Sequence, residues 1–275
     1  MSENTITLSG APLDYRDVGA GPVVVFVHGV YVAGAVWDDV VDQLSATHRC
    51  IVPTWPLGAH AREVPDGVDL SIEAAARRVP ELLEALDLHD ATIVVNDSGG
   101  GITVTALGTG HPGLSRIGAL VVTNCDTFEH FPPPSFKPVV KLCQLGIGGG
   151  IVRFFASGLG QRMFLGQVCA TKPSAERAQQ IFGAFPTNAR SRRDGVRVTA
   201  SMKNQTLAAV PALEALDVPV RVVWGDADKV FPKGDGERLA QTAKHGSYVS
   251  VPGSGAYVMV DAPDRLVAEI SAVAK

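Results

Sequence analysis

Short apolar runs that end in turn residues alternate with helical patterns along most of this chain. The runs VVVFVHG (23–29), CIVP (50–53), ATIVV (91–95) and VPVRVVWG (218–225) are nearly continuous in apolar residues, as strands buried on both faces of a sheet are. Residues 72–86 carry apolar side chains at helical spacing behind Ser71, a suitable N-cap. This alternation predicts an α/β fold with a mostly parallel central sheet flanked by helices.

Further strands are expected at the two ends of this pattern and in its middle. Residues 117–124 and 247–252 are strand candidates of the same kind. Residues 6–8 and 13–16 alternate between apolar and polar side chains, which is typical of an exposed hairpin. The predicted sheet therefore begins with a hairpin and continues with buried strands.

The strand signal disappears between about residues 128 and 207. In its place stand the proline-rich FPPPSFKP (131–138), the glycines at 148–150 and several short helical patterns. We therefore predict one α/β core, residues 1–127 and 208–275, with an inserted helical cap over residues 128–207.

Composition narrows the classes of function. The 275 residues have a formal net charge of -4, and the only dense basic run, residues 190–193, is short, so no nucleic-acid partner is expected. No apolar run is long enough to span a bilayer and no signal sequence is visible, so we expect a cytoplasmic protein without a membrane partner, as a monomer or homodimer. The four cysteines have no CxxC spacing and apolar neighbours, which predicts buried thiols rather than a metal site or a disulfide framework. We expect no cofactor.

The segment VVNDSGGG (94–101) leads from a buried strand into a polar pair and three glycines. A strand–turn–helix of this kind lifts one side chain above the edge of the sheet, and small neighbours make room for the tight turn. Asp97 and Ser98 are the two candidates for the raised position, and the glycines alone fit both registers.

Four segments of the chain resemble the α/β-hydrolase superfamily, in particular its branch of haloalkane dehalogenases and epoxide hydrolases. They are the oxyanion segment HGVYVAGAVW (28–37), the nucleophile turn NDSGGG (96–101), the acid loop WGDADKVFP (224–232) and the histidine loop VPGSGAYVMVDAPDRL (251–266). The resemblance covers nearly the whole predicted core.

This resemblance implies a nucleophile, an oxyanion hole and an orienting acid. Strand length favours Asp97 as the nucleophile, because family members place a short apolar strand and one polar residue before it. A carboxylate attacks carbon to give an ester that water then cleaves, which implies epoxides or alkyl halides as substrates, whereas Ser98 would imply ordinary esters. The backbone N–H groups of Val30 and Ser98 would form the oxyanion hole. Asp228, or alternatively Asp126, would orient a histidine.

Three features depart from the family's pattern. Ala256 stands where the family carries the histidine that acts as general base, a role typically worth about 10²–10⁴-fold in rate. His60 and His130 are the two histidines that we consider as replacements. Ser98 stands where dehalogenases carry a tryptophan that helps to hold halide. Residues 128–207 contain no tyrosine, although epoxide hydrolases normally activate the epoxide with tyrosines there.

Two functions are compatible with these residues. The first is a hydrolase acting on a small hydrophobic epoxide, alkyl halide or ester, whose base is relocated or lost at Ala256, naturally or by engineering. The second is a non-hydrolytic protein that binds a ligand or catalyses isomerisation, elimination or cyclisation. In both cases we expect the pocket to be lined by His28, Tyr31, His60, Phe131, Phe136 and Tyr257, together with Phe154, Phe155 and Phe164.

Overall fold

The computed structural model, which describes residues 3–275, contains an eight-stranded sheet in the order β1-β2-β4-β3-β5-β6-β7-β8. β1 and β2 form an antiparallel hairpin, β2 pairs antiparallel with β4, and every other pair is parallel. The strands are β1 (Glu3–Leu8), β2 (Ala11–Val18), β3 (Val23–Val27), β4 (Arg49–Thr54), β5 (Ala91–Val95), β6 (Ile117–Thr123), β7 (Val220–Gly225) and β8 (Gly246–Val251). The predicted α/β fold with a mostly parallel sheet is confirmed.

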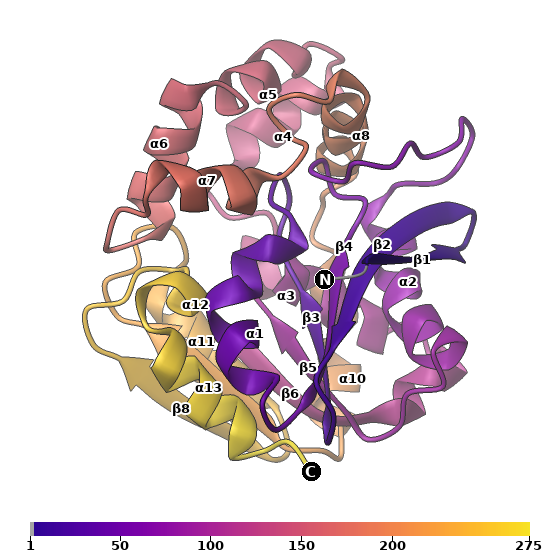
Figure 1. Ribbon diagram of the computed structural model, residues 1–275, viewed down its shortest axis with the longest axis vertical. Coiled ribbons are helices and arrows are strands. Elements are labelled where there is room, and N and C mark those ends of the chain that lie inside the picture. The colour runs from indigo at the N-terminus through magenta and orange to yellow at the C-terminus, as the bar shows by residue number, and fades with distance from the viewer. Residues whose placement is uncertain (1–2) are drawn as a thin grey trace.

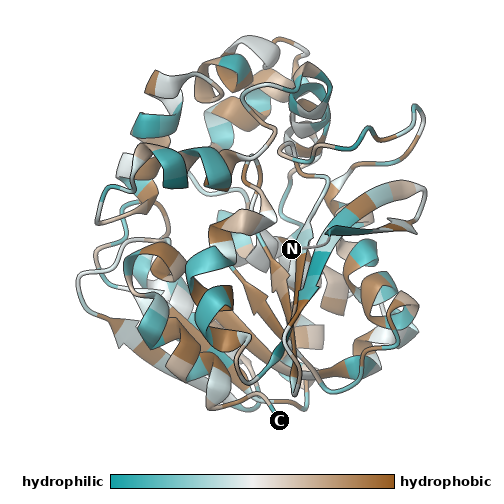
Figure 2. Ribbon diagram, in the orientation of Figure 1, coloured by the Kyte–Doolittle hydropathy of each residue, from teal (hydrophilic) through white to brown (hydrophobic). Residues whose placement is uncertain are grey.

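Helices cover both faces of this sheet (Figure 1). On one face, α1 packs against α12 and α13, and on the other α3 packs against α2, α9 and α10, while α11 packs on β7 and β8. Figure 2 shows the central strands as a hydrophobic layer between these helices, whereas the β1–β2 hairpin carries more polar residues. The helices are α1 (Asp38–Leu44), α2 (Ile72–Ala85), α3 (Ser98–Leu107), α10 (Val210–Ala215), α11 (Lys233–Thr242), α12 (Val258–Asp261) and α13 (Pro263–Ser271), with 3-10 turns η1 (Gly34–Trp37) and η2 (Pro112–Arg116).

Most of the chain between β6 and β7, from α4 to α8, forms a group of short helices above one end of the sheet, at the top of Figure 1, whereas α9 and α10 pack against α3. We call residues 128–207 the inserted segment. Its elements are η3 (Phe128–His130), α4 (Lys137–Gln144), α5 (Gly149–Phe155), α6 (Gly158–Val168), α7 (Ala175–Phe182), α8 (Ala189–Ala200) and α9 (Gln205–Ala208). The division into a core and a cap at these boundaries stays a prediction.

Local signals in the sequence correspond closely to the observed elements. Ser71 caps α2, and its hydroxyl accepts a hydrogen bond of 3.2 Å from the Ala74 N–H. Pro80 lies inside α2, which continues through it.

All four cysteines are free and buried. Within residues 3–275 no helix is both long and apolar enough to cross a membrane.

Candidate active site

Asp97 occupies the sharp turn between β5 and α3. Its backbone has φ 55° and ψ -139°, a conformation that costs a non-glycine residue about 1–3 kcal/mol and persists only where the surroundings hold it. The Asp97 N–H donates a hydrogen bond of 2.9 Å to the carbonyl of Asn124, at the end of the neighbouring strand. A Cβ atom at Gly99 would collide with the Val27 carbonyl. The turn therefore requires a small residue two positions after Asp97, whereas Ser98 is already the first residue of α3.

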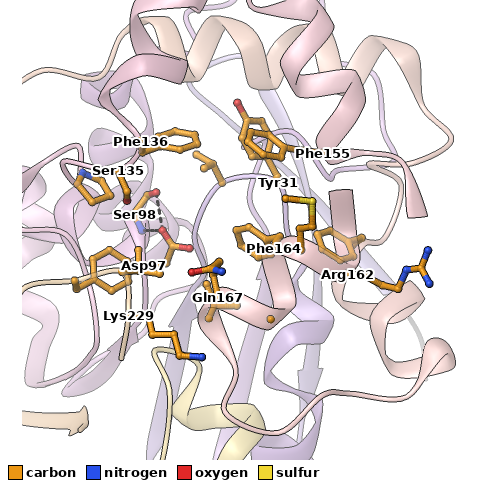
Figure 3. Close-up of a pocket in the computed structure, with 18 of the residues that line it drawn as sticks. Tyr31, Asp97, Ser98, Ser135, Phe136, Phe155, Arg162, Phe164, Gln167 and Lys229 are labelled. Atoms are coloured by element: carbon orange, nitrogen blue, oxygen red, sulfur yellow. Dashed lines mark hydrogen bonds between the residues drawn. The ribbon is translucent and has the colours of Figure 1, made fainter. Parts of the chain in front are cut away.

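Three donors hold the carboxylate of Asp97. Its Oδ1 accepts a hydrogen bond of 2.6 Å from the Ser98 N–H and one of 3.0 Å from the Ser98 hydroxyl, both drawn in Figure 3. Its Oδ2 accepts a hydrogen bond of 3.2 Å from the hydroxyl of Tyr257. Burial raises the pKa of Asp97, and these donors oppose the rise because they stabilise the charged form. The carboxylate is thus held in one orientation.

The loop after β3 lies directly against this carboxylate. A Cβ atom at Gly29 would lie 2.6 Å from Cγ of Asp97. His28 fixes the loop, since its Nε2 accepts the Trp55 N–H at 2.9 Å and its Nδ1 therefore carries the proton donated to the Gly29 carbonyl at 2.8 Å. Burial lowers the pKa of His28 to about 4, so the ring is neutral. Among residues 3–275 the Val30 N–H has no hydrogen-bond partner.

A cavity of about 440 Å³ lies between this turn and the inserted segment (Figure 3). This volume suits a small-molecule ligand, and most of the lining is apolar or aromatic. Asp97 is the only acidic residue in the lining. The core contributes Val30, Tyr31, Asp97, Ser98, Lys229, Val230 and Phe231, and the inserted segment contributes Pro133, Ser135, Phe136, Phe155, Arg162, Met163, Phe164, Gly166, Gln167, Val168, Phe182 and Phe185.

The two candidate orienting acids have different surroundings. Asp228 follows β7 and accepts hydrogen bonds from the Val230 N–H at 2.7 Å and from the Asn124 amide at 2.7 Å. Asp126 is fully buried, and neither of its carboxyl oxygens has a hydrogen-bond partner in the described range 3–275. Burial raises the pKa of Asp126 well above its usual value, and the charge of Asp97 adds to the rise. Asp228 is therefore the better stabilised of the two carboxylates.

Neither candidate replacement base is hydrogen-bonded to Asp97. His60 Nε2 lies 3.4 Å from a carboxylate oxygen of Asp194, on α8. His130 Nδ1 lies 2.8 Å from a carboxylate oxygen of Asp235, on α11. Within residues 3–275, no cluster of His, Cys, Asp and Glu side chains could hold a metal ion. Among residues 3–275, the side chain that donates a hydrogen bond to the Asp97 carboxylate from outside its own turn is a phenol, not an imidazole.

Ala256 is buried on the loop that follows β8. Its carbonyl accepts a hydrogen bond of 2.9 Å from the amide of Asn96, which also donates to Thr123 and to the Asn124 carbonyl. Asn96 thereby connects the ends of β5 and β6 to the Ala256 loop. Asn96 and Asn124 were not predicted as site residues, although a polar residue between the apolar run 91–95 and Asp97 was a visible signal.

The structure brings together only part of the predicted pocket. Tyr31, Phe136, Phe155 and Phe164 line the cavity. Tyr257 contacts the carboxylate of Asp97 instead, and its ring packs edge-on against Phe164 at 5.9 Å between ring centroids. The other predicted residues lie outside the lining: His28 and His60 form the hydrogen bonds described above, Phe131 packs where a side chain at Gly101 would otherwise lie, and Phe154 is exposed.

This sheet, with a polar turn at the end of β5 beneath inserted helices, defines an α/β-hydrolase fold. Residues 24–269 match the model of the Alpha/beta hydrolase family, and the chain belongs to that family. The resemblance inferred from the sequence is confirmed at this level.

The similar proteins include enzymes of different kinds. Haloalkane dehalogenase 2 of Mycobacterium tuberculosis is 28% identical, over 94% of this chain and 90% of the relative. A cis-3-alkyl-4-alkyloxetan-2-one decarboxylase of Shewanella oneidensis is 26% identical, over 96% of this chain and 86% of the relative. An α/β-hydrolase-fold protein from Burkholderia ambifaria has a TM-score of 0.83 at 23% identity, over 97% of this chain and 96% of that one, which shows the fold alone.

Proposed function

We propose that the protein is an enzyme that acts on a small hydrophobic substrate in the cavity beneath the inserted segment, with the Asp97 carboxylate as nucleophile. One observation carries this proposal. The only acidic side chain that lines an apolar cavity stands on the sharp turn after β5, with both of its oxygens held by hydrogen-bond donors. A carboxylate fixed in this way is poised to react with a bound carbon centre.

The first step needs no base. An oxygen of the ionised carboxylate bonds to an electrophilic carbon, and the bond from that carbon to its leaving atom breaks, with the electron pair leaving on that atom. The product is an ester of Asp97. Epoxides and alkyl halides are the substrates that fit such an attack, and a haloalkane dehalogenase among the relatives supports this class. The Ser98 and Val30 N–H groups would stabilise the oxyanion when the ester is later cleaved.

The second step, hydrolysis of the ester, lacks a histidine as general base. Water attacks an ester carbonyl effectively only when a base removes its proton. Burial and the charge of Asp97 raise the pKa of Tyr257 well above its usual value, so its phenol stays protonated and donates a hydrogen bond, but it does not take a proton from water near neutrality. We therefore expect the ester to be cleaved about 10²–10⁴-fold more slowly than with a general base.

A non-hydrolytic reaction is the second candidate, and the contact between Tyr257 and Asp97 favours it. A site with a carboxylate and a phenol suits reactions in which no water is activated. One relative is named as a decarboxylase of a four-membered lactone. Loss of carbon dioxide from such a ring leaves an alkene and consumes no water, so this chemistry would not require the missing base.

Intact-mass spectrometry after exposure to small epoxides and alkyl halides tests the first candidate, with peptide mapping to locate the adduct. We expect one adduct, on Asp97, and none in Asp97→Asn, which has the same shape but no nucleophilic carboxylate. An adduct on Ser98, or none with any reagent of suitable size, would reject Asp97 as nucleophile. Incubation with a cis-3,4-dialkyloxetan-2-one tests the second candidate, because decarboxylation gives an alkene and hydrolysis gives a hydroxy acid.

A further inference from the structure

Large hydrophobic side chains are exposed almost exclusively on one part of the molecule. Among the described residues six are strongly exposed, and all but Leu207 lie between residues 145 and 163. These five are Leu145, Ile147, Phe154, Leu159 and Met163, exposed by 37 to 65%. They lie on α5, on α6 and on the loop that joins α4 to α5, at the top of Figure 1. α5 and α6 pack against each other, and apolar exposure gathered on neighbouring elements is typical of an interaction surface rather than of ordinary surface composition.

The same stretch carries positive charge without negative charge. Residues 137–172 contain five Lys and Arg side chains and no Asp or Glu, although the whole chain has a net charge of -4. All five are exposed: Lys137, Lys141, Arg153, Arg162 and Lys172. None of them forms an ion pair with any residue in the described range 3–275. Elsewhere basic side chains are commonly paired, as Arg238 is with Glu129 and Arg190 is with Glu63.

We propose that residues 137–172 form a docking surface for anionic lipid bilayers. A peripheral surface that combines protruding apolar side chains with unpaired cations binds at the lipid interface, because the apolar groups enter the acyl boundary and the cations are attracted to anionic headgroups. Such binding needs no membrane-spanning helix. It departs from the expectation, drawn from the sequence, that the protein has no membrane partner.

A second copy of the chain is a poorer occupant of this surface. A two-fold interface brings the same patch of both subunits together. Five cations would then face five cations, and the stretch has no acidic side chain to pair with them. Like charges placed opposite one another disfavour association. The charge pattern therefore favours an anionic lipid surface.

The docking surface also borders the cavity, because Arg162 and Met163 belong to the cavity lining. Phe155 and Phe164 belong to the same stretch and also line the cavity. A hydrophobic compound dissolved in the bilayer would thus be delivered beside the cavity. Docking itself does not depend on the function proposed for Asp97.

Flotation of the full-length protein with vesicles tests the proposal. We expect it to float with vesicles of phosphatidylglycerol and phosphatidylcholine in equal parts at low ionic strength, and much less with phosphatidylcholine alone. High salt should weaken the binding, because it screens exposed charges. Failure to float with the anionic vesicles at low ionic strength would overturn the proposal.

Two pairs of substitutions test the two contributions separately. Lys141→Gln with Arg153→Gln should reduce binding to anionic vesicles by about fivefold for each charge removed. Leu145→Ser with Ile147→Ser should reduce it at low and at high ionic strength alike. Thermal melting by circular dichroism checks that all variants remain folded.

Matched controls lie outside the docking surface. Lys275→Gln removes an exposed cation at the C-terminus, and Leu207→Ser removes the remaining strongly exposed hydrophobic side chain. Both should bind as the parent protein does, and a loss equal to that of the test variants would count against a localised surface. A dimer in light scattering that the Leu145 and Ile147 substitutions dissociate, in a protein that never floats, would assign the surface to a second copy and overturn the lipid proposal.

Discussion

The hydroxyl of Tyr257 donates a hydrogen bond of 3.2 Å to Oδ2 of Asp97, and within residues 3–275 no imidazole does so. Tyr257 directly follows Ala256, the position at which the family resemblance implied a histidine. A phenol with a raised pKa stabilises the carboxylate as a donor, but it does not take a proton from water near neutral pH. Attack by Asp97 on the substrate needs no base, whereas hydrolysis of the resulting ester does. The contact with Tyr257 is therefore compatible with the first step but does not supply the base for the second.

Tyr257→Phe should make adduct formation at Asp97 more sensitive to acid. The hydroxyl lowers the pKa of Asp97, so its removal leaves burial less opposed and raises that pKa further. Since only the ionised form attacks, the adduct should form about tenfold more slowly on the acid side of the pH profile and at a similar rate on its alkaline plateau. Mass spectrometry across pH measures this. Tyr248→Phe, on β8, is the control, and an unchanged profile in Tyr257→Phe would show that the contact has no influence on ionisation.

Gly29→Ala should block the reaction without unfolding the protein. The added methyl group would lie 2.6 Å from Cγ and 2.8 Å from Oδ2 of Asp97, well inside contact distance, so the carboxylate must leave its position. We expect adduct formation to fall at least about 100-fold. Gly234→Ala is the control, because nothing lies within 4 Å of its added Cβ. Normal labelling in a folded Gly29→Ala protein would contradict the proposed geometry.

Asp126→Asn should increase stability at neutral and alkaline pH. The native state raises the pKa of Asp126 well above its usual value, so it keeps a proton that the unfolded chain releases near pH 3.9. Stability therefore falls as pH rises above that value, by up to about 1.4 kcal/mol per pH unit, until Asp126 ionises in the native state. The amide in Asp126→Asn does not titrate, so this loss of stability with rising pH disappears.

Thermal unfolding at about pH 5 and pH 8 measures the effect, with a larger gain expected at the higher pH. Asp217→Asn provides a contrast, since its exposed carboxyl has a pKa lowered by hydrogen bonds from Lys244 and His245. A loss of stability in Asp126→Asn that is equal at both pH values would show that the carboxyl makes contacts that the amide cannot replace.

Ala256→His should shorten the lifetime of the ester. An imidazole on the buried loop beside Tyr257 could remove a proton from water, and we expect hydrolysis to be faster by about 10²–10⁴-fold. Turnover of the epoxide or halide and loss of the adduct mass report it. Ala256→Gln introduces a side chain of similar size without a base. A folded histidine variant whose adduct persists as long as in the glutamine variant would argue against a hydrolytic origin of the site.

The strands and the position of the turn could be predicted from the sequence alone. The apolar run 91–95 becomes β5 with the same bounds, and residues 117–124 become β6 to within one residue. Both signals are local, because a strand buried on both faces must be apolar throughout. The glycines after Asp97 are equally local, since the turn leaves no room for a Cβ atom at Gly99.

The tertiary structure alone decided which side chains meet. Tyr257 was expected to line the pocket, yet its hydroxyl contacts Asp97, 160 residues away in the chain. His60 was considered as a base, yet its ring lies 3.4 Å from Asp194, 134 residues away. Such long-range contacts depend on the order of the strands in the sheet and on the path of each loop beyond them. The residue pattern along one strand predicts which faces of that strand are buried. It does not predict which distant loop will lie above the end of the strand.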